Sequence, residues 1–245
     1  MTSLRLPKVM GHRGAAGLAP ENTLASIRKV AECGLDWVEF DVMLAGDGVP
    51  ILYHDDTLDR TTGRDGLVAE TPSEELLALD AGAWFGPDFA GELVPSFAAA
   101  LDLVQACGLR VNVEIKPTAG TEVETAQGVV SELSRLWPAS APVPLISSFH
   151  TSCLEVAMDL RPDWPRAYIS FEMSEHWHDD LIRLDCVSFH LWHVLTHRDL
   201  VREIKDMGLG MACFTVNEVD LARRLFEIGV DCVITDDPPV ILDAL

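Results

Sequence analysis

Four glycine-centred junctions recur along this chain, and they constrain its fold more than any other feature. Each follows a helix-like segment and precedes an apolar run, at residues 33–36, 107–110, 207–210 and 228–231. A glycine just past the end of a helix, followed by an apolar residue and then a strand, is typical of the turn from an α-helix into a β-strand. The sequence therefore predicts helices and strands in alternation.

Apolar segments at regular intervals are predicted to be strands, and a helical segment follows each. The predicted strands are Lys8–Gly11, Trp37–Val42, Arg110–Ile115, Leu145–Ser148, Arg166–Ile169, Cys186–Phe189, Gly210–Val216 and Cys232–Thr235. The last predicted helix is Pro239–Leu245. This alternation favours a closed parallel (β/α)8 or TIM barrel, a fold of ~250 residues. We therefore expect one TIM-barrel domain over residues 1–245, with an open doubly wound sheet as the alternative.

One connection is too long for a simple turn between a strand and a helix. From about residue 44 to 95 the chain contains a turn at Gly46–Gly48, a returning strand at Val49–Tyr53 and a short helix at Ser73–Leu79. Loops that follow barrel strands lie at the C-terminal mouth, where TIM-barrel enzymes place their active sites. We interpret this segment as a small insertion after strand 2.

The charge and the apolar pattern argue against several classes of protein. The formal net charge is −21, from 39 acidic and 18 basic residues. A protein that binds nucleic acid is expected to have a basic surface instead. An anionic membrane repels a protein whose surface is acidic. No apolar run approaches the ~18 residues of a membrane span, and residues 1–9 lack the apolar core of a signal peptide. The six cysteines form no CxxC pair, so we expect a cytoplasmic protein with reduced thiols.

The predicted second strand carries two acids where a buried strand should be apolar. Glu39 and Asp41 alternate with Val38, Phe40 and Val42, so the acids share one face of the strand and the apolar residues share the other. Two carboxylates on an inner face would repel each other, and a bound cation would remove that cost. The alternative is an amphipathic edge strand whose acids face water.

The predicted third strand repeats this pattern. Asn112, Glu114 and Lys116 share one face, and Glu114 would lie beside the end of the second strand. Together, Glu39, Asp41 and Glu114 would make an all-oxygen site for one divalent cation. Mg²⁺ and Ca²⁺ suit such a site, and Mn²⁺ is a further candidate. Zinc is not indicated, because the sequence has no matching set of His or Cys ligands. A buried Glu114–Lys116 ion pair is the structural alternative.

Two histidines and an arginine are predicted at the same mouth. His12 and Arg13 follow the first strand between Gly11 and Gly14, and His54 ends the returning strand of the insertion. Histidine can transfer protons near neutral pH, and arginine offers a planar fork for phosphate. The alternatives are a loop histidine with a surface arginine, and a His54 that simply bonds to Asp55.

These segments together resemble the glycerophosphodiester phosphodiesterase family, and specifically its short cytoplasmic bacterial members. The resemblance runs through Gly11-His12-Arg13-Gly14, Ala19-Pro20-Glu21-Asn22-Thr23, Val38-Glu39-Phe40-Asp41-Val42, His54 to Gly63, Leu79 to Phe85, Val113-Glu114-Ile115-Lys116, Cys186 to Leu191, Phe214-Thr215-Val216-Asn217 and Ile234-Thr235-Asp236. It spans the chain from the first predicted strand to the last.

The resemblance implies a role for each candidate residue. The divalent cation would be held by Glu39, Asp41 and Glu114; His12 and His54 would be the acid and base; Arg13 and Lys116 would contact phosphate. The family often has Trp where this chain has Phe214, which keeps an apolar wall but loses the indole N–H. We also expect Phe214, Trp84 and His190 to form part of the pocket wall.

We therefore predict metal-dependent hydrolysis of small glycerophosphodiesters, such as glycerophosphocholine or glycerophosphoethanolamine, to sn-glycerol 3-phosphate and an alcohol. A lysophospholipase D-type or cyclising phosphodiesterase on the same site is an alternative. Two further alternatives are a barrel that binds phosphodiesters without cleaving them and a metal-assisted enolising enzyme. The sequence leaves the head group, the native metal and the oligomeric state open.

Overall fold

Parallel strands close into a barrel in this computed structural model, which describes residues 4–243 and 245. Within those residues the barrel has eight parallel strands, in the order β1-β2-β4-β5-β6-β7-β8-β9, and β9 pairs with β1 to close the ring. Their bounds are β1 Val9–Gly11, β2 Trp37–Leu44, β4 Arg110–Ile115, β5 Leu145–Ser148, β6 Arg166–Ser170, β7 Cys186–Trp192, β8 Gly210–Phe214 and β9 Cys232–Thr235. The predicted (β/α)8 barrel is confirmed, and the open sheet is wrong.

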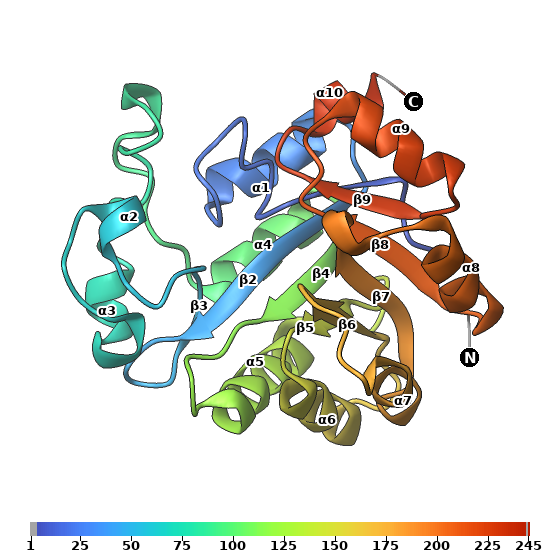
Figure 1. The fold of residues 1–245 in the computed structure, drawn as a ribbon. Helices are drawn as coiled ribbons and strands as arrows, with labels where there is room; N and C mark the ends of the chain where they lie inside the picture. The colour runs from blue at the N-terminus through green and yellow to red at the C-terminus, as the bar shows by residue number, and fades with distance from the viewer. Residues whose placement is uncertain (1–3, 244) are drawn as a thin grey trace.

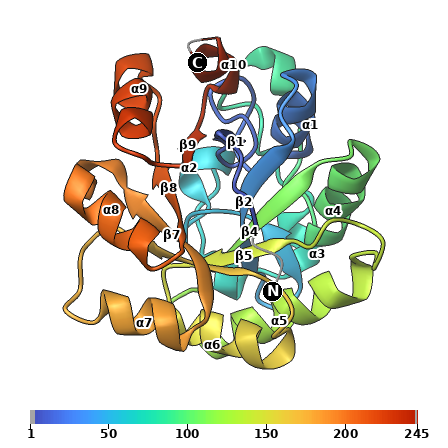
Figure 2. The same ribbon diagram turned by 90° about the vertical axis from the view of Figure 1, so that its right-hand side faces the viewer.

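Helices surround the ring of strands on its outside (Figure 2). They are α1 Leu24–Glu32, α4 Phe97–Ala106, α5 Glu122–Leu136, α6 Thr151–Leu160, α7 Trp177–Arg183, α8 Arg198–Asp206, α9 Val219–Glu227 and α10 Pro238–Leu242. The predicted last helix, Pro239–Leu245, is shorter in the structure, and residue 244 lies outside the described residues. None of the described helices has the combined length and apolar character needed to cross a membrane.

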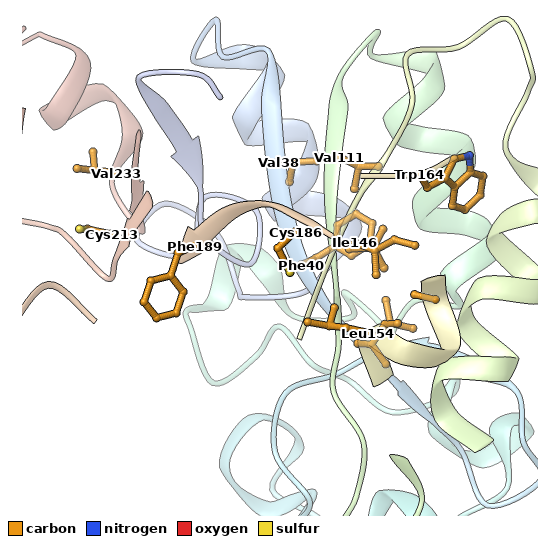
Figure 3. Packing of buried hydrophobic residues seen from close by; sticks show 14 of the residues in the cluster. Val38, Phe40, Val111, Ile146, Leu154, Trp164, Cys186, Phe189, Cys213 and Val233 are labelled. Carbon is orange, nitrogen blue, oxygen red and sulfur yellow. The ribbon is translucent and has the colours of Figure 1, made fainter. Parts of the chain in front are cut away.

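The alternation of side chains along each strand divides the core into two parts. Val38, Phe40 and Val111 point outward and pack with Ile146 and Leu154 between the barrel and its helices (Figure 3). Residues on the inner faces near the start of the strands form a second apolar cluster, which includes Met10, Trp37, Leu145, Ala167 and Ala212. This inner plug fills the lower barrel, so a ligand can enter only from the C-terminal mouth.

The insertion leaves the barrel where β2 ends, as predicted. Its strand β3, Pro50–Leu52, pairs antiparallel with Val42–Leu44 of β2. Short helices follow at α2 Asp59–Thr62 and α3 Ser73–Leu76, with single turns at η1 Val68–Glu70 and η2 Pro87–Phe89. The arrow of β2 runs out to this region, at the left of Figure 1.

The insertion has its own small apolar cluster. Met43, Ile51, Tyr53, Leu58 and Val68 are among its buried members. The antiparallel pairing and this cluster hold the end of β3 beside the barrel mouth. The expectation of one domain over residues 1–245 stays a prediction, and it includes residues 1–3, which lie outside the described part of the chain.

Candidate active site

Adjacent strands bring a cluster of acidic side chains together at the mouth of the barrel. Asp41 on β2 is in register with Glu114 on β4, and Glu39 lies two residues earlier on the same face of β2. Among the described residues, oxygen atoms of these three carboxylates all lie within 4.8 Å of one another. All three side chains are buried. The edge-strand alternative for Glu39 and Asp41 is therefore wrong, because their face lines the barrel interior.

Burial makes this cluster electrostatically strained without a cation. Burial, together with the charge of Asp41, raises the pKa of Glu39 well above its usual range and that of Glu114 to about 8. Burial would also raise the pKa of Asp41, but the charges of Arg13 and its other neighbours outweigh it and lower that pKa to about 2. Among the described residues, Glu39 Oε1 is buried and has no hydrogen-bond partner. An unpaired, buried carboxylate oxygen beside two further carboxylates suits a hard divalent cation.

Asn22 fixes the orientation of Asp41 from the loop after β1. Its Nδ2 donates to Asp41 Oδ2 at 2.8 Å, and its Oδ1 accepts from the Asp41 backbone N–H at 3.1 Å. Asn22 has a φ of 54°, in the left-handed region that asparagine tolerates. Helix α1 is capped by Thr23, whose side chain accepts from the Ser26 N–H. The sequence motif around Asn22 was part of the family resemblance, but nothing in it indicated this contact.

His12 is held by a carboxylate from the opposite end of the chain. Its Nδ1 donates to Asp236 Oδ1 at 2.6 Å, and Asp236 Oδ2 accepts from Asn217 Nδ2 at 2.7 Å. The pairing of β1 with β9 makes this contact possible, because it places the two strand ends side by side. Nδ1 is engaged, so Nε2 is the nitrogen left for a ligand. The Cβ of any larger residue at Gly11 would lie 2.4 Å from the Gly14 carbonyl oxygen, which explains the glycine there.

His54 has an equivalent partner next to it in sequence. Its Nδ1 donates to Asp55 Oδ1 at 2.6 Å, and Asp55 Oδ2 accepts from Arg60 Nε at 2.5 Å. Burial lowers the pKa of His54. The predicted alternative, a His54 bonded to Asp55, is thus observed, but the same ring also lines the cavity described below.

A series of ion pairs connects His54 to Arg13, which we call the ion-pair ladder Asp55–Arg60–Glu21–Arg13. Both terminal nitrogens of Arg60 donate to Glu21, each at 2.7 Å, and Arg13 donates to Glu21 at 2.8 Å. Arg13 Nε also lies 3.4 Å from Asp41 Oδ2. Burial alone would lower the pKa of Arg13, but these carboxylates outweigh it and raise that pKa. The ladder ties the insertion to the loop after β1.

Lys116 stands at the end of β4, above Glu114. Its Nζ lies 3.9 Å from Glu114 Oε1 and 5.9 Å from the centre of the Phe149 ring. The predicted Glu114–Lys116 ion pair therefore exists, at long range. It does not remove either residue from the mouth of the barrel, because both line the same cavity.

All seven polar candidates surround one cavity of about 320 Å³. It is lined by His12, Arg13, Glu39, Asp41, His54, Glu114 and Lys116, together with Asn112, Phe149, Ile169, Phe171, His190, Trp192, Phe214, Thr215 and Ile234. The charged residues come from the β1, β2, insertion and β4 side. Aromatic residues that follow or end β5 to β8 form the opposite wall.

Of the three residues predicted for the pocket wall, Phe214 and His190 line the cavity and Trp84 does not. Phe214 lines it and packs edge-on against Phe149 and Phe171, with ring centres 5.8 and 5.2 Å apart. Trp84 does not line the cavity in the described part of the chain, and its predicted role in the pocket wall is wrong. It lies in the insertion, 44 % exposed, with its indole N–H bonded to the Ala81 carbonyl oxygen. Its aromatic contact is Phe85, a local neighbour.

Known proteins resemble this chain over nearly its whole length. The model of the glycerophosphoryl diester phosphodiesterase family matches residues 12–240. The chain belongs to this family. A glycerophosphodiester phosphodiesterase from Caldanaerobacter subterraneus subsp. tengcongensis is 32 % identical over 239 residues, covering 96 % of each chain. One from Bacillus altitudinis is 27 % identical, covering 95 % of this chain and 96 % of the relative.

A solved structure of the family shares both fold and sequence with this chain. It is an Oleispira antarctica phosphodiesterase in complex with the product sn-glycerol 3-phosphate. It is 40 % identical, has a TM-score of 0.94, and the match covers 98 % of this chain and 96 % of that one. Membership of the glycerophosphoryl diester phosphodiesterase family identifies the barrel as that of a phosphoric diester hydrolase.

Proposed function

We propose that this protein hydrolyses glycerophosphodiesters, such as glycerophosphocholine or glycerophosphoethanolamine, to sn-glycerol 3-phosphate and an alcohol, with a divalent cation and a pair of histidines. One observation carries the proposal: His12, His54, Arg13, Lys116 and the acidic cluster of Glu39, Asp41 and Glu114 all line one cavity. The Oleispira antarctica relative was solved with sn-glycerol 3-phosphate, which supports the same product here.

The acidic cluster would hold the cation. Glu39, Asp41 and Glu114 offer only oxygen atoms, which favour Mg²⁺ or Ca²⁺, with Mn²⁺ as a further candidate. When bound, the cation supplies charge that stabilises the negative oxygens of the phosphate in the transition state. Asn22 keeps one oxygen of Asp41 engaged, so the remaining oxygen is directed to a ligand.

His12 and His54 would transfer the protons of the reaction. Each has Nδ1 fixed by an aspartate, which orients the ring and leaves Nε2 for the substrate. One histidine takes a proton from the nucleophile, and the other gives a proton to the departing alcohol. Either water or the glycerol 2-hydroxyl can serve as the nucleophile, because both need the same pair.

Arg13 and Lys116 would position the phosphate. They lie on opposite sides of the acidic cluster, Arg13 beside Asp41 and Lys116 beside Glu114. Their positive charges compensate the carboxylates, so an anionic diester can approach them.

The cytoplasmic location expected from the sequence stays a prediction; all six cysteines, which lie within the described residues, have free thiols.

The test is a coupled assay for glycerol 3-phosphate on several head groups, with Mg²⁺, Mn²⁺ and Ca²⁺ in turn. We expect product release that stops when EDTA is added and returns when the cation is restored. Binding of a diester without any release of product would instead identify a non-catalytic barrel. Enolising chemistry would leave the phosphodiester intact.

A second candidate substrate class follows from the mouth of the cavity. Phe171 and Trp192 line it and are 58 % and 38 % exposed, and the nearby Val194 is also exposed. Such an apolar rim can contact the acyl chain of a lysophospholipid. Lysophosphatidylcholine should therefore be assayed beside glycerophosphocholine. A higher kcat/KM for the lipid would assign the protein to the lysophospholipase D type.

A further inference from the structure

Basic side chains gather at the end of the barrel opposite the mouth. Arg5 and Lys8 precede β1, Arg110 begins β4, and all three line one cavity of about 860 Å³ together with Lys205. Since parallel strands all start at the same end of a barrel, this cavity lies on the far side of the inner plug from the barrel mouth. We call it the lower cavity. Its positive charge belongs to a chain whose net charge is −21.

Three of these cations have no acidic partner. Lys205 pairs with Asp231. Among the described residues, the side chains of Arg5, Lys8 and Arg110 form no ion pair and donate no hydrogen bond. Their N–H donors are therefore available to a ligand that enters the lower cavity.

Aromatic rings, rather than carboxylates, position two of the cations. The guanidinium carbon of Arg110 lies 5.7 Å from the centre of the Trp37 ring, and Nζ of Lys8 lies 4.7 Å from the centre of the Phe226 ring. A cation over an aromatic face is held by the charge distribution of the ring and keeps its N–H groups for other partners. Both side chains are thus held in place before a ligand arrives, which lowers the entropic cost of binding.

The cations do not cap the helices that end at the lower cavity. Basic side chains near the end of a helix can bond to its last carbonyl groups. Here the backbone already serves these carbonyls, because the N–H groups of Gly108 and Leu109 donate to carbonyls of α4, and those of Gly208 and Leu209 donate to carbonyls of α8. Capping therefore does not explain why the basic side chains gather at this end of the barrel.

We propose that the lower cavity binds the diphosphate group of a small anion through Arg5, Lys8 and Arg110. Arginine offers a planar fork that matches phosphate oxygens, and lysine adds a point charge. Three unpaired cations from separate segments suit a ligand with more than one phosphate. The cavity is large enough to hold an organic part beside the diphosphate. The inference is independent of the proposed function, because it concerns a second site.

Apolar residues of the same cavity leave two sources for such a diphosphate. Leu4, Leu6 and Pro7 line the lower cavity beside the cations. They can contact the organic part of a nucleoside diphosphate, whereas inorganic pyrophosphate has no such part. The two ligands share the chemistry that the cations recognise.

The experiment is a calorimetric titration of the protein freed of divalent cations, with inorganic pyrophosphate in one arm and ADP in the other. We expect one saturable site per chain, with an affinity that falls as salt is added. Arg5→Met and Arg110→Met should each weaken binding by at least about 10-fold, because each removes charge-assisted hydrogen bonds. Tighter binding of ADP would identify a ligand with an organic part, and tighter binding of pyrophosphate would identify the free anion.

Two control variants separate the lower cavity from the rest of the molecule. Arg198 also forms no ion pair within the described part of the chain, but it begins α8, at the mouth end of the barrel. Lys116 lines the cavity at the mouth. Arg198→Met and Lys116→Met should both bind the anion like the wild type. Thermal unfolding without the anion checks that each variant is folded. If Arg110→Met is not, the exposed Arg5 carries the test.

Two outcomes would overturn the inference. One is the lack of saturable binding to the wild-type protein, or an unchanged affinity in Arg5→Met. The other is binding that is lost in Lys116→Met and kept in the two arginine variants, which would place the anion at the barrel mouth. Failure of the proposed function would leave these titrations unchanged, because they involve neither turnover nor a divalent cation.

Discussion

Glu39 shows at the scale of one residue why we propose a cation at this site. Its carboxylate is buried, one oxygen accepts from the Arg13 backbone N–H at 2.8 Å, and the other has no partner among the described residues. Burial and the neighbouring carboxylates raise its pKa well above the usual range. The ionised form of Glu39 is therefore unfavourable in the metal-free protein, and a bound cation would stabilise it.

Glu39→Gln should separate stability from cation binding. Without a divalent cation, we expect the variant to be as stable as the wild type or more stable, because a neutral amide replaces a carboxyl whose ionised form is unfavourable when buried. Its cation affinity should fall by at least about 10–100-fold. Both are measured by thermal unfolding with and without Mg²⁺ or Ca²⁺. Asp237→Asn, outside the acidic cluster, is the control; an unchanged cation-induced rise in Tm in Glu39→Gln would contradict the metal assignment.

The two cavity histidines should each be needed for turnover. His12→Ala and His54→Ala are each expected to lower kcat by ~10²–10⁴-fold, the usual contribution of a positioned acid or base. The measurement is steady-state release of glycerol 3-phosphate. His178→Ala is the control, because His178 pairs with Glu203 on the helical exterior. Near-normal kcat in either cavity variant would remove that histidine from the acid and base pair.

At the scale of elements, strand β2 contributes to both the core and the cavity, because its side chains alternate between the two faces of the strand. Its outward residues, including Phe40, pack in the main core, where Phe40 meets Phe97 edge-on at 6.2 Å. Its inward residues Glu39 and Asp41 line the cavity. The insertion that follows adds His54, and the ion-pair ladder connects that histidine to the loop after β1.

The ion-pair ladder should control activity more than stability. Arg60→Met removes the contacts that Arg60 makes with Asp55 and Glu21. We therefore expect kcat to fall about 10-fold or more, because His54 is positioned less well. Arg60→Lys should recover part of the lost kcat. Arg64→Met is the matched control, because Arg64 is equally exposed, at 41 %, and pairs with Glu75 in the same insertion. Equal effects of the Arg60→Met and Arg64→Met changes on kcat would show that the ladder has no special role.

At the scale of the whole molecule, the net charge of −21 surrounds a site that must accept a phosphodiester. Long-range repulsion slows the approach of an anion to an acidic protein, and salt screens it, with a Debye length of about 8 Å at physiological ionic strength. The positive charges of Arg13 and Lys116 act only inside the cavity.

Salt should therefore affect substrates according to their charge. Raising the ionic strength from about 0.01 to 0.15 M should increase kcat/KM for the anionic glycerophosphoglycerol several-fold, by an amount on the order of 2–10. Zwitterionic glycerophosphocholine should change little and serves as the internal control. A fall of kcat/KM for the anionic diester with salt would mean that the local positive charges dominate its approach.

The sequence by itself determined the barrel and the polar residues that line its cavity. The glycine junctions mark four of the returns from helix to strand, and the two-residue period of a strand shows that Glu39 and Asp41 share a face. Both signals are local, so they can be interpreted without coordinates. The approach of Glu114 to Asp41 also followed, because neighbouring parallel strands end at the same edge of the barrel.

Only the tertiary structure decided which residues hold the polar side chains of the cavity in place. Asp236 reaches His12 across 224 positions of sequence because β9 closes the barrel against β1. Asn22 reaches Asp41 through the positive φ of its own loop rather than capping a helix. Trp84 turns away from the cavity because its contacts lie within the insertion. Such contacts depend on how loops converge after the barrel has closed, and no periodicity in the chain encodes that convergence.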